Sequence, residues 1–88
     1  MVRRRVIVHG SVQGVFFRDS ARRMAQQRDV AGWIANRRDG TVEAVFEGEL
    51  EAVDRLVQFM HEGPRGAEVE DVEVTEERPE GLGGFSVR

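Results

Sequence analysis

The sequence predicts an α+β fold in which two helices cover one face of an antiparallel sheet. Three observations lead to this prediction. Two segments place apolar residues three and four positions apart, several valine-rich segments are bounded by glycine, and the segments follow one another in the order β-α-β-β-α-β. This is the order of the ferredoxin-like split β-α-β arrangement. Because two helices cannot surround a sheet, its second face should stay partly wet.

The first strand and the first helix flank a glycine-containing loop. Val6, Ile7 and Val8 predict a strand over residues 2–9 that ends before Gly10. A helix is expected over about residues 18–28, with arginines and glutamines on its polar face. Its apolar positions recur at helical spacing and are Phe17, Ala21, Met24 and Ala25.

The next two strands are expected to form a hairpin. Its arms span residues 30–37 and 41–47, with Asp39 and Gly40 between them. This pair predicts a tight primed turn, because such a turn needs positive φ, which glycine adopts readily.

The last third of the chain predicts a helix followed by one or two strands. Gly63 caps this helix and Pro64 prevents its continuation; its apolar residues are Leu50, Val53, Leu56, Val57 and Met60. The valines of residues 67–79 predict a strand, and their shift from odd to even positions indicates a β-bulge near Asp71. Residues 83–88 are compatible with a short final strand.

The predicted topology brings two distant segments together. A right-handed β-α-β crossover makes the first two strands parallel, so their carboxyl ends lie at the same edge of the sheet. The first strand leads into the loop from Gly10 to Arg18, and the second ends at residues 35–37. This loop and Asn36 are therefore expected to be neighbours, at the kind of strand end where α/β proteins bind ligands.

Composition excludes several kinds of chemistry. Eighty-eight residues, 40% of them hydrophobic, suit one globular domain, expected over residues 1–88. The chain has no cysteine for a thiolate nucleophile and no lysine for a Schiff base, and its two histidines, His9 and His61, offer few metal ligands. No apolar run is long enough for a membrane span or a signal peptide, so a cytoplasmic protein without a membrane partner is expected.

The charge pattern argues against a nucleic-acid partner. The formal net charge is −3, and the three consecutive arginines from Arg3 to Arg5 make a short basic footprint. They are expected to be a solvated strand start. The acidic run of residues 68–77 is expected on an exposed face or edge of the sheet.

The loop from Gly10 to Arg18 supports two interpretations. Gly10 and Gly14 permit unusual backbone conformations, so several N–H groups could converge on a small anion beside the helix dipole and Arg18. Alternatively, the loop merely turns and Arg18 pairs with a surface carboxylate. Spacing alone does not choose between the two.

Two blocks of the sequence resemble the acylphosphatase family. The segment GSVQGVFFR, residues 10–18, looks like the phosphate-gripping loop of that family. The segment GWIANRRDGTVEAVFEG, residues 32–48, resembles its second block, with the asparagine at Asn36 and the Asp-Gly turn after it. The resemblance covers essentially the whole chain. It implies a ferredoxin-like fold and a hydrolase that splits acyl phosphates into a carboxylate and inorganic phosphate.

The resemblance also implies a site. Arg18 and Asn36 would be the catalytic residues, with Arg18 holding the phosphoryl oxygens and Asn36 orienting the attacking water. Backbone N–H groups would share the charge of the phosphate, and they belong to Gln13, Gly14, Val15, Phe16, Phe17 and Arg18. The leaving carboxylate, whose conjugate acid has a pKa of about 4, departs without a proton. No metal or other cofactor is implied, and nothing requires more than a monomer.

Other residues near the loop have plainer expected roles. Gln13 is expected to contact phosphate through its backbone rather than through its amide. Phe17 is expected in the core and Trp33 is expected to pack against its neighbours. His9 is expected to end the first strand, and Arg37 and Arg38 are expected to be solvated charges on the hairpin.

Two other functions fit the same pattern. A non-catalytic anion-binding module would keep the fold and the loop without turnover. A nucleic-acid module of the RRM type shares the β-α-β-β-α-β order, but it stacks bases on exposed aromatic residues of its sheet. Here the first strand has no aromatic residue, and the segment TVEAVFEG has only Phe46.

Overall fold

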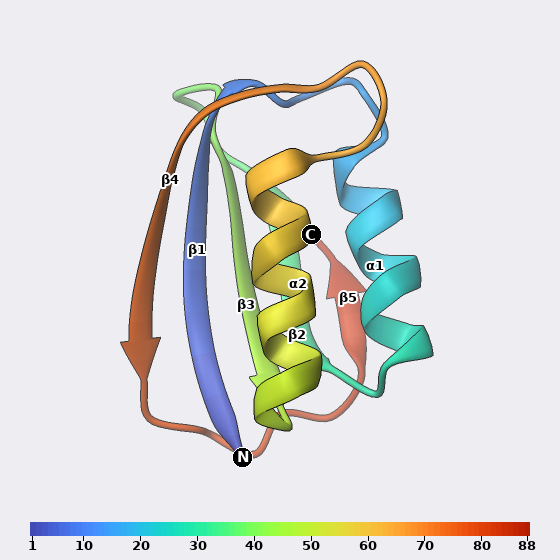
Figure 1. The fold of residues 1–88 in the computed structure, drawn as a ribbon, viewed down its shortest axis with the longest axis vertical. Coiled ribbons are helices and arrows are strands. Elements are labelled where there is room, and N and C mark those ends of the chain that lie inside the picture. Colours follow the sequence, from blue (N-terminus) through green and yellow to red (C-terminus); the bar gives the residue numbers. More distant parts are fainter.

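Five strands form one sheet, and both helices pack on the same face of it (Figure 1). The computed structural model describes all 88 residues. Its elements are β1 (Val2–Ser11), α1 (Phe17–Gln27), β2 (Ala31–Asn36), β3 (Val42–Gly48), α2 (Leu50–Glu62), β4 (Glu68–Glu77) and β5 (Phe85–Val87). The predicted α+β fold and element order are confirmed. Neither helix has the length and apolar character needed to cross a membrane.

The strand order is β4-β1-β3-β2-β5. β3 pairs antiparallel with both β1 and β2, so β1 and β2 run in the same direction and end at the same edge of the sheet, as predicted. β4 is antiparallel to β1, whereas β5 is parallel to β2. The fifth strand therefore makes the sheet mixed rather than wholly antiparallel.

The hydrophobic core lies between the helices and the sheet. Because side chains alternate along a strand, every second residue of β1, β2 and β3 faces the helices, and the central ones are buried; examples are Val6, Val8, Ile34, Val42 and Phe46. Phe46 stacks on Phe85 of β5 with 5.7 Å between ring centroids. Phe46 is the one aromatic residue of β3, and an RRM-type module would need it exposed on the sheet to stack on a base. It is fully buried, so it cannot take that role.

The opposite face of the sheet carries ion pairs between β1, β3 and β4. Arg3 is only 4% exposed, and its Nε donates to Glu77 at 2.8 Å. Arg5 donates to both Glu77 and Glu43, each at 2.7 Å. The expectation of a solvated strand start is therefore wrong. The antiparallel register explains the difference, because it places the acidic end of β4 beside the basic start of β1. β4 is an edge strand of the sheet, as expected for the acidic run.

Trp33 packs on this same face, against arginines rather than in the core. The guanidinium carbon of Arg88 lies 4.4 Å from its ring centroid, and that of Arg5 lies 5.6 Å away. Such cation–π contacts stabilise the ring where it would otherwise meet water.

The bulge predicted near Asp71 is confirmed. His9 lies opposite Asp71 and Gly10 lies opposite Val69, which leaves Glu70 as the extra residue of β4. The bulge sits where β1 passes into the loop that precedes α1.

The connection between β2 and β3 differs from the predicted tight primed turn. The N–H of Arg37 donates to the carbonyl of Thr41 at 2.9 Å, and the N–H of Gly40 donates to the carbonyl of Arg37 at 3.2 Å. The hydrogen bond between Arg37 and Thr41 therefore encloses three residues, 38–40, and of these only Gly40 has positive φ, at +91°. Asp39 instead accepts hydrogen bonds from the N–H and the hydroxyl of Thr41.

Candidate active site

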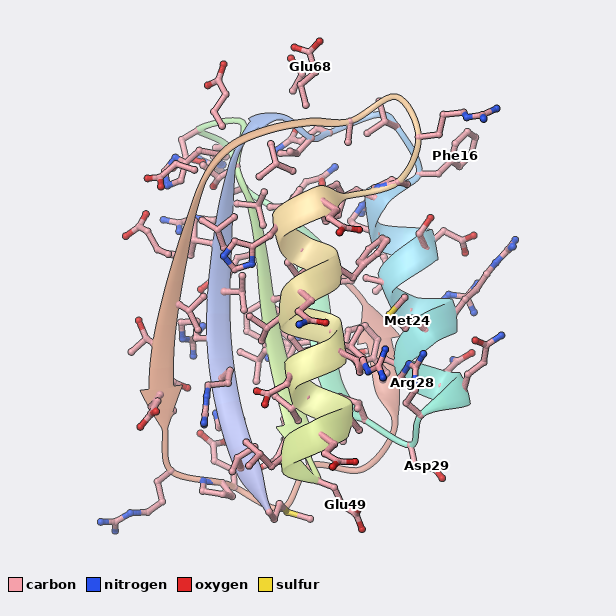
Figure 2. The ribbon with its side chains drawn as sticks, viewed as in Figure 1. Phe16, Met24, Arg28, Asp29, Glu49 and Glu68 are labelled. Atoms are coloured by element: carbon pink, nitrogen blue, oxygen red, sulfur yellow. The ribbon has the colours of Figure 1, made fainter.

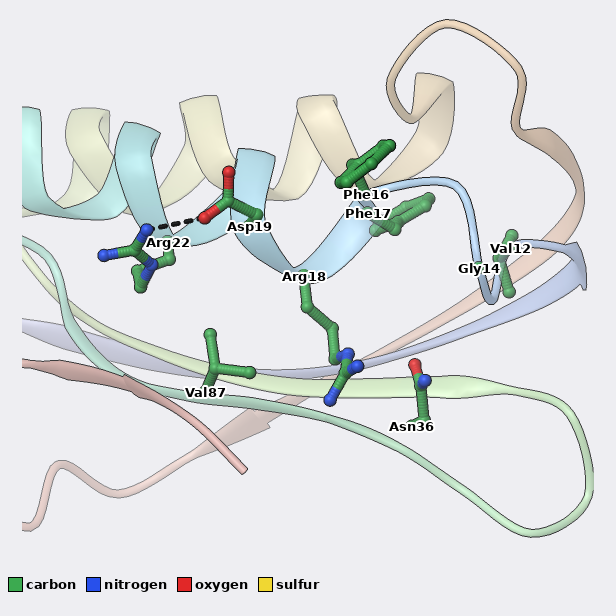
Figure 3. Close-up of a pocket in the computed structure, with 9 residues that line it drawn as sticks. All are labelled: Val12, Gly14, Phe16, Phe17, Arg18, Asp19, Arg22, Asn36 and Val87. Carbon is green, nitrogen blue, oxygen red and sulfur yellow. Dashed lines mark hydrogen bonds and ion pairs between the residues drawn. The ribbon is translucent and has the colours of Figure 1, made fainter.

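A pocket of about 450 Å³ opens at the edge of the sheet where β1 and β2 end. Its lining residues are Val12, Gly14, Phe16, Phe17, Arg18, Asp19, Arg22, Asn36 and Val87. Figure 3 shows the side chains of Arg18 and Asn36 pointing into the space between α1 and β2. The structure thus brings Asn36 and the loop of residues 10–18, which we call the anion loop, into one site.

The backbone N–H groups of residues 13–18 have no hydrogen-bond acceptor in the protein. The first backbone bond of α1 runs from the N–H of Ser20 to the carbonyl of Phe16, at 3.0 Å, and no side chain caps the helix. Six consecutive donors are therefore free where the positive end of the helix dipole lies. This arrangement favours a small anion with several oxygen acceptors.

The sign of the backbone angle φ alternates from residue to residue between Gly14 and Phe16 of the anion loop. Gly14 and Phe16 have φ of +75° and +59°, whereas Val15 between them does not have positive φ. Alternation of left-handed and right-handed residues turns successive N–H groups toward one concave face, which is the geometry of an anion-binding nest. Gly14 adopts this conformation freely, but for an aromatic residue it costs about 1–2 kcal/mol.

Burial of the Phe16 ring does not compensate for this strain. The residue is 82% exposed, and Figure 2 shows its side chain pointing away from the body of the molecule. Strained backbone of this kind concentrates at functional sites. The neighbouring Phe17 is buried in the core as expected and packs against Phe59, with 5.8 Å between ring centroids.

Gly10 has a different role from Gly14. It lies within β1 with φ of +127°, and a Cβ atom there would fall 2.1 Å from the carbonyl oxygen of Glu68. This glycine is therefore required by the close approach of β1 to β4 at the bulge, and only the second glycine shapes the nest.

The side chain of Gln13 closes the anion loop. Its Nε2 donates to the carbonyl oxygens of Arg37 at 2.8 Å and Thr41 at 2.9 Å, on both sides of the β2–β3 connection. Both N–H bonds of the amide nitrogen are thereby used within the protein. Only the backbone N–H of Gln13 is free for a ligand.

Arg18 makes no ion pair with an Asp or Glu side chain. Its Nη1 donates to the main-chain oxygen of Arg88 at 3.0 Å, which leaves its other N–H groups without a partner. The neighbouring carboxylate of Asp19 binds Arg22 and Arg23 instead, at 2.5 and 3.0 Å. Pairing of Arg18 with the side chain of a surface Asp or Glu, the alternative interpretation of the sequence, does not occur.

The carboxylate of Asp19 is held in its charged form. The hydrogen bond from Arg22, together with the charges of Arg23 and Arg22, lowers the pKa of Asp19 below its ordinary value. Asn36, at the exposed end of β2, has no hydrogen-bond partner for its side chain in the protein. Its amide is therefore available to water or a ligand.

Gln13 and Val15, two of the expected phosphate-binding residues, are not part of the pocket lining, and His9, Arg37 and Arg38 also lie outside the pocket. His9 has its Nε2 2.6 Å from Glu73, on another part of the sheet. Arg37 lies 4.0 Å from Asp39, and Arg38 is exposed on the same connection. No group of three His, Asp or Glu side chains is placed to hold a metal ion.

Four lining residues were not among the site residues expected from the sequence, and these are Val12, Asp19, Arg22 and Val87. Val12 and Asp19 are near neighbours of the expected residues in the chain. Arg22 follows Arg18 by four positions, so helical spacing alone places both on one face of α1. Val87 belongs to β5, and its place beside the site depends on the pairing of β5 with β2, which no local pattern indicates.

Known proteins share both the sequence and the fold. The family model described as Acylphosphatase matches residues 4–87. The chain is 60% identical over 85 residues to an acylphosphatase of Rubrobacter xylanophilus, covering 96% of this chain and 77% of that protein. Among solved structures, the acylphosphatase from Bacillus subtilis has a TM-score of 0.94 at 42% identity, with 100% of this chain and 99% of that chain covered. An acylphosphatase from Coxiella burnetii has a TM-score of 0.93 at 39% identity, with 99% and 92% covered. The two sequence blocks, the fold and these relatives agree that the chain belongs to the acylphosphatase family.

Proposed function

We propose that this protein is an acylphosphatase, a hydrolase that cleaves the carboxyl–phosphate bond of acyl phosphates. The observation that carries the proposal is the set of unpartnered N–H groups of residues 13–18, in one site with the side chains of Arg18 and Asn36. Family membership supports the choice of reaction.

In this proposal the anion loop binds the phosphoryl group. The N–H groups and the guanidinium of Arg18 donate to its oxygens, and they stabilise the charge that spreads over those oxygens in the transition state. An arginine suits this role because its planar fork keeps its charge at any physiological pH and matches a phosphate geometrically.

Asn36 is proposed to orient the attacking water. The water oxygen bonds to phosphorus while the bond from phosphorus to the acyl oxygen breaks. The carboxylate leaves with the electron pair of that bond and without a proton, and the protons of the water stay with the phosphate product or pass to solvent. The chemistry therefore needs positioning and charge stabilisation rather than a strong general acid.

Every group in this mechanism lies between Gln13 and Asn36 of one chain. The proposal accordingly includes a monomer that acts in the cytoplasm without a metal or other cofactor, through the single domain of residues 1–88.

The proposal is tested by measuring phosphate release from benzoyl phosphate. Arg18→Ala is expected to lower kcat/KM by at least about a hundredfold and to weaken binding of inorganic phosphate. Arg18→Lys should recover only part of this loss, because an ammonium lacks the planar fork. Arg23→Ala, on the solvent side of the same helix, is the matched control. If the wild-type protein binds phosphate but releases none from benzoyl phosphate at high protein concentration, it is a non-catalytic anion-binding module instead.

A further inference from the structure

A second arginine lines the pocket that contains Arg18. Arg22 lies one turn further along α1, and the mechanism proposed above does not use it. In Figure 3, Arg22 and Asp19 lie on one side of Arg18, and Gly14 and Asn36 lie on the other. A phosphoryl group on the anion loop would therefore leave the Arg22 end of the pocket to the acyl group.

The charge at this end of the pocket is only partly neutralised. Asp19 is shared between Arg22 and Arg23, with N–O distances of 2.5 and 3.0 Å. One carboxylate cannot balance two guanidinium groups, so a net positive charge remains beside Arg18, which pairs with no Asp or Glu side chain. This charge stands out in a chain whose formal net charge is −3.

The two arginines that share Asp19 are not equivalent. The side chain of Arg23 is 73% exposed and does not line the pocket, whereas that of Arg22 is 38% exposed and does. An ordinary ion pair on a helix surface explains Arg23 completely. It does not explain why Arg22 is turned into the cavity, beside the apolar wall formed by Val87 (Figure 3).

We propose that Arg22 selects acyl phosphates whose acyl group carries a second anionic group, a carboxylate in the first instance, remote from the bond that is cleaved. This inference rests on the proposed function, because it takes the anion loop as the phosphoryl site. A guanidinium fork binds a carboxylate through two parallel hydrogen bonds, and partial burial weakens the screening of their charges. Arg22 would exchange part of its contact with Asp19 for the carboxylate of the substrate, while Arg23 continues to balance Asp19.

The test compares two non-hydrolysable ligands that differ only in the distal charge. These are phenacylphosphonate and its 4-carboxy derivative, and their Kd values are measured by titration calorimetry. The wild-type protein is expected to bind the carboxylated ligand roughly tenfold more tightly, as is typical of one charge-assisted contact at a partly exposed site. Arg22→Gln should abolish this preference. Arg23→Gln leaves Arg22 as the only partner of Asp19 and should therefore weaken the preference. Arg55→Gln, at an exposed position on α2, should keep it.

A variant with the opposite expected effect strengthens the test. Asp19→Asn releases Arg22 from its competing carboxylate, so the preference for the carboxylated ligand should increase. Equal affinities for the two ligands in the wild-type protein would overturn the proposal. So would a preference that persists unchanged in Arg22→Gln.

Turnover separates this inference from the proposed function. With benzoyl phosphate and 4-carboxybenzoyl phosphate as substrates, the effect of Arg22→Gln should appear in KM rather than kcat, because a distal contact is made equally in the ground and transition states. A binding preference without any turnover would support Arg22 and contradict the proposed function. Turnover of both substrates with equal KM in the wild-type protein would contradict the role of Arg22 alone.

Discussion

The side-chain amide of Gln13 joins the anion loop to the connection that follows Asn36. Its Nε2 lies 2.8 Å from the carbonyl oxygen of Arg37 and 2.9 Å from that of Thr41. A single side chain thereby links the two segments that the proposed reaction requires, the free N–H groups and the end of β2. We therefore propose that Gln13 positions Asn36 through this contact, in addition to the backbone donor that the proposed mechanism assigns to it.

Replacing Gln13 by glutamate should uncouple these two segments. Gln13→Glu keeps the shape of the side chain but removes both donors and places a carboxylate against two carbonyl oxygens. Because a displacement of about 1 Å in a reacting geometry costs roughly a hundredfold, kcat/KM for benzoyl phosphate should fall by one to two orders of magnitude. The control is Gln58→Glu, an exposed position on α2. Unchanged kinetics in Gln13→Glu would show that the loop positions itself without this contact.

The two glycines of the anion loop should respond differently to alanine. At Gly10 the new methyl would lie 2.1 Å from the backbone oxygen of Glu68, so Gly10→Ala should lower the free energy of unfolding by more than about 3 kcal/mol. At Gly14 no atom lies within 4 Å, and only the positive φ is penalised, at about 1–2 kcal/mol. Urea unfolding of the two variants measures the difference. Equal losses would contradict the separate roles assigned to the bulge glycine and the nest glycine.

Asn36 should affect turnover without affecting phosphate binding. Its side chain has no partner in the protein, so Asn36→Ala should leave stability nearly unchanged. The inhibition constant of inorganic phosphate should stay close to the wild-type value, whereas kcat should fall by at least about a hundredfold. A variant that keeps near-normal rates would exclude Asn36 as the residue that orients water.

Glu47 links stability to pH at the far end of the sheet from the site. The residue is 1% exposed, and burial alone would raise the pKa of its carboxyl. Hydrogen bonds from the backbone N–H groups of Leu82, Glu80 and Gly81, together with the charge of Arg3, outweigh burial, so the pKa of Glu47 is lowered. A pKa that is lower in the folded state contributes stability above the unfolded value, about 4.3, and this contribution disappears as the pH falls through the folded value.

At pH 7, where the charged acceptor matters, Glu47→Gln should therefore have an unfolding free energy about 2 kcal/mol below that of the wild-type protein. When the pH is lowered, the unfolding free energy of the variant should fall by less than that of the wild-type protein, because the variant has no carboxylate to protonate at this position. Denaturant unfolding at pH 7 and at pH 3–4 checks both statements. The exposed Glu62→Gln serves as the control. Parallel stability curves for the wild-type protein and Glu47→Gln would contradict the account.

Local patterns predicted the elements well because helical spacing, valine runs and turn glycines are properties of short segments. The bulge opposite Gly10 and the helix end at Gly63 were predicted for this reason. Features that depend on pairing between distant strands were not. The burial of Arg3 follows from the register of β4, and the parallel β5 is only three residues long, too short for a periodic pattern.

The site was partly predictable for similar reasons. Topology alone made Asn36 a neighbour of the anion loop, and the resemblance to a family added a reason for Arg18. What the sequence could not show is that the N–H groups of residues 13–18 lack acceptors, because this depends on where every carbonyl and carboxylate of the fold lies. The Asp-Gly pair likewise suits both a two-residue and a three-residue connection, and only the hydrogen bond from Arg37 to Thr41 distinguishes them.

A crystal structure of the wild-type protein with bound inorganic phosphate tests the central claim most directly. The account predicts a phosphate whose oxygens lie about 3 Å from several backbone nitrogens of residues 13–18 and from the guanidinium of Arg18, with a water molecule beside the amide of Asn36. A phosphate bound elsewhere, with the loop N–H groups and Arg18 left free in a protein that hydrolyses benzoyl phosphate, would contradict it.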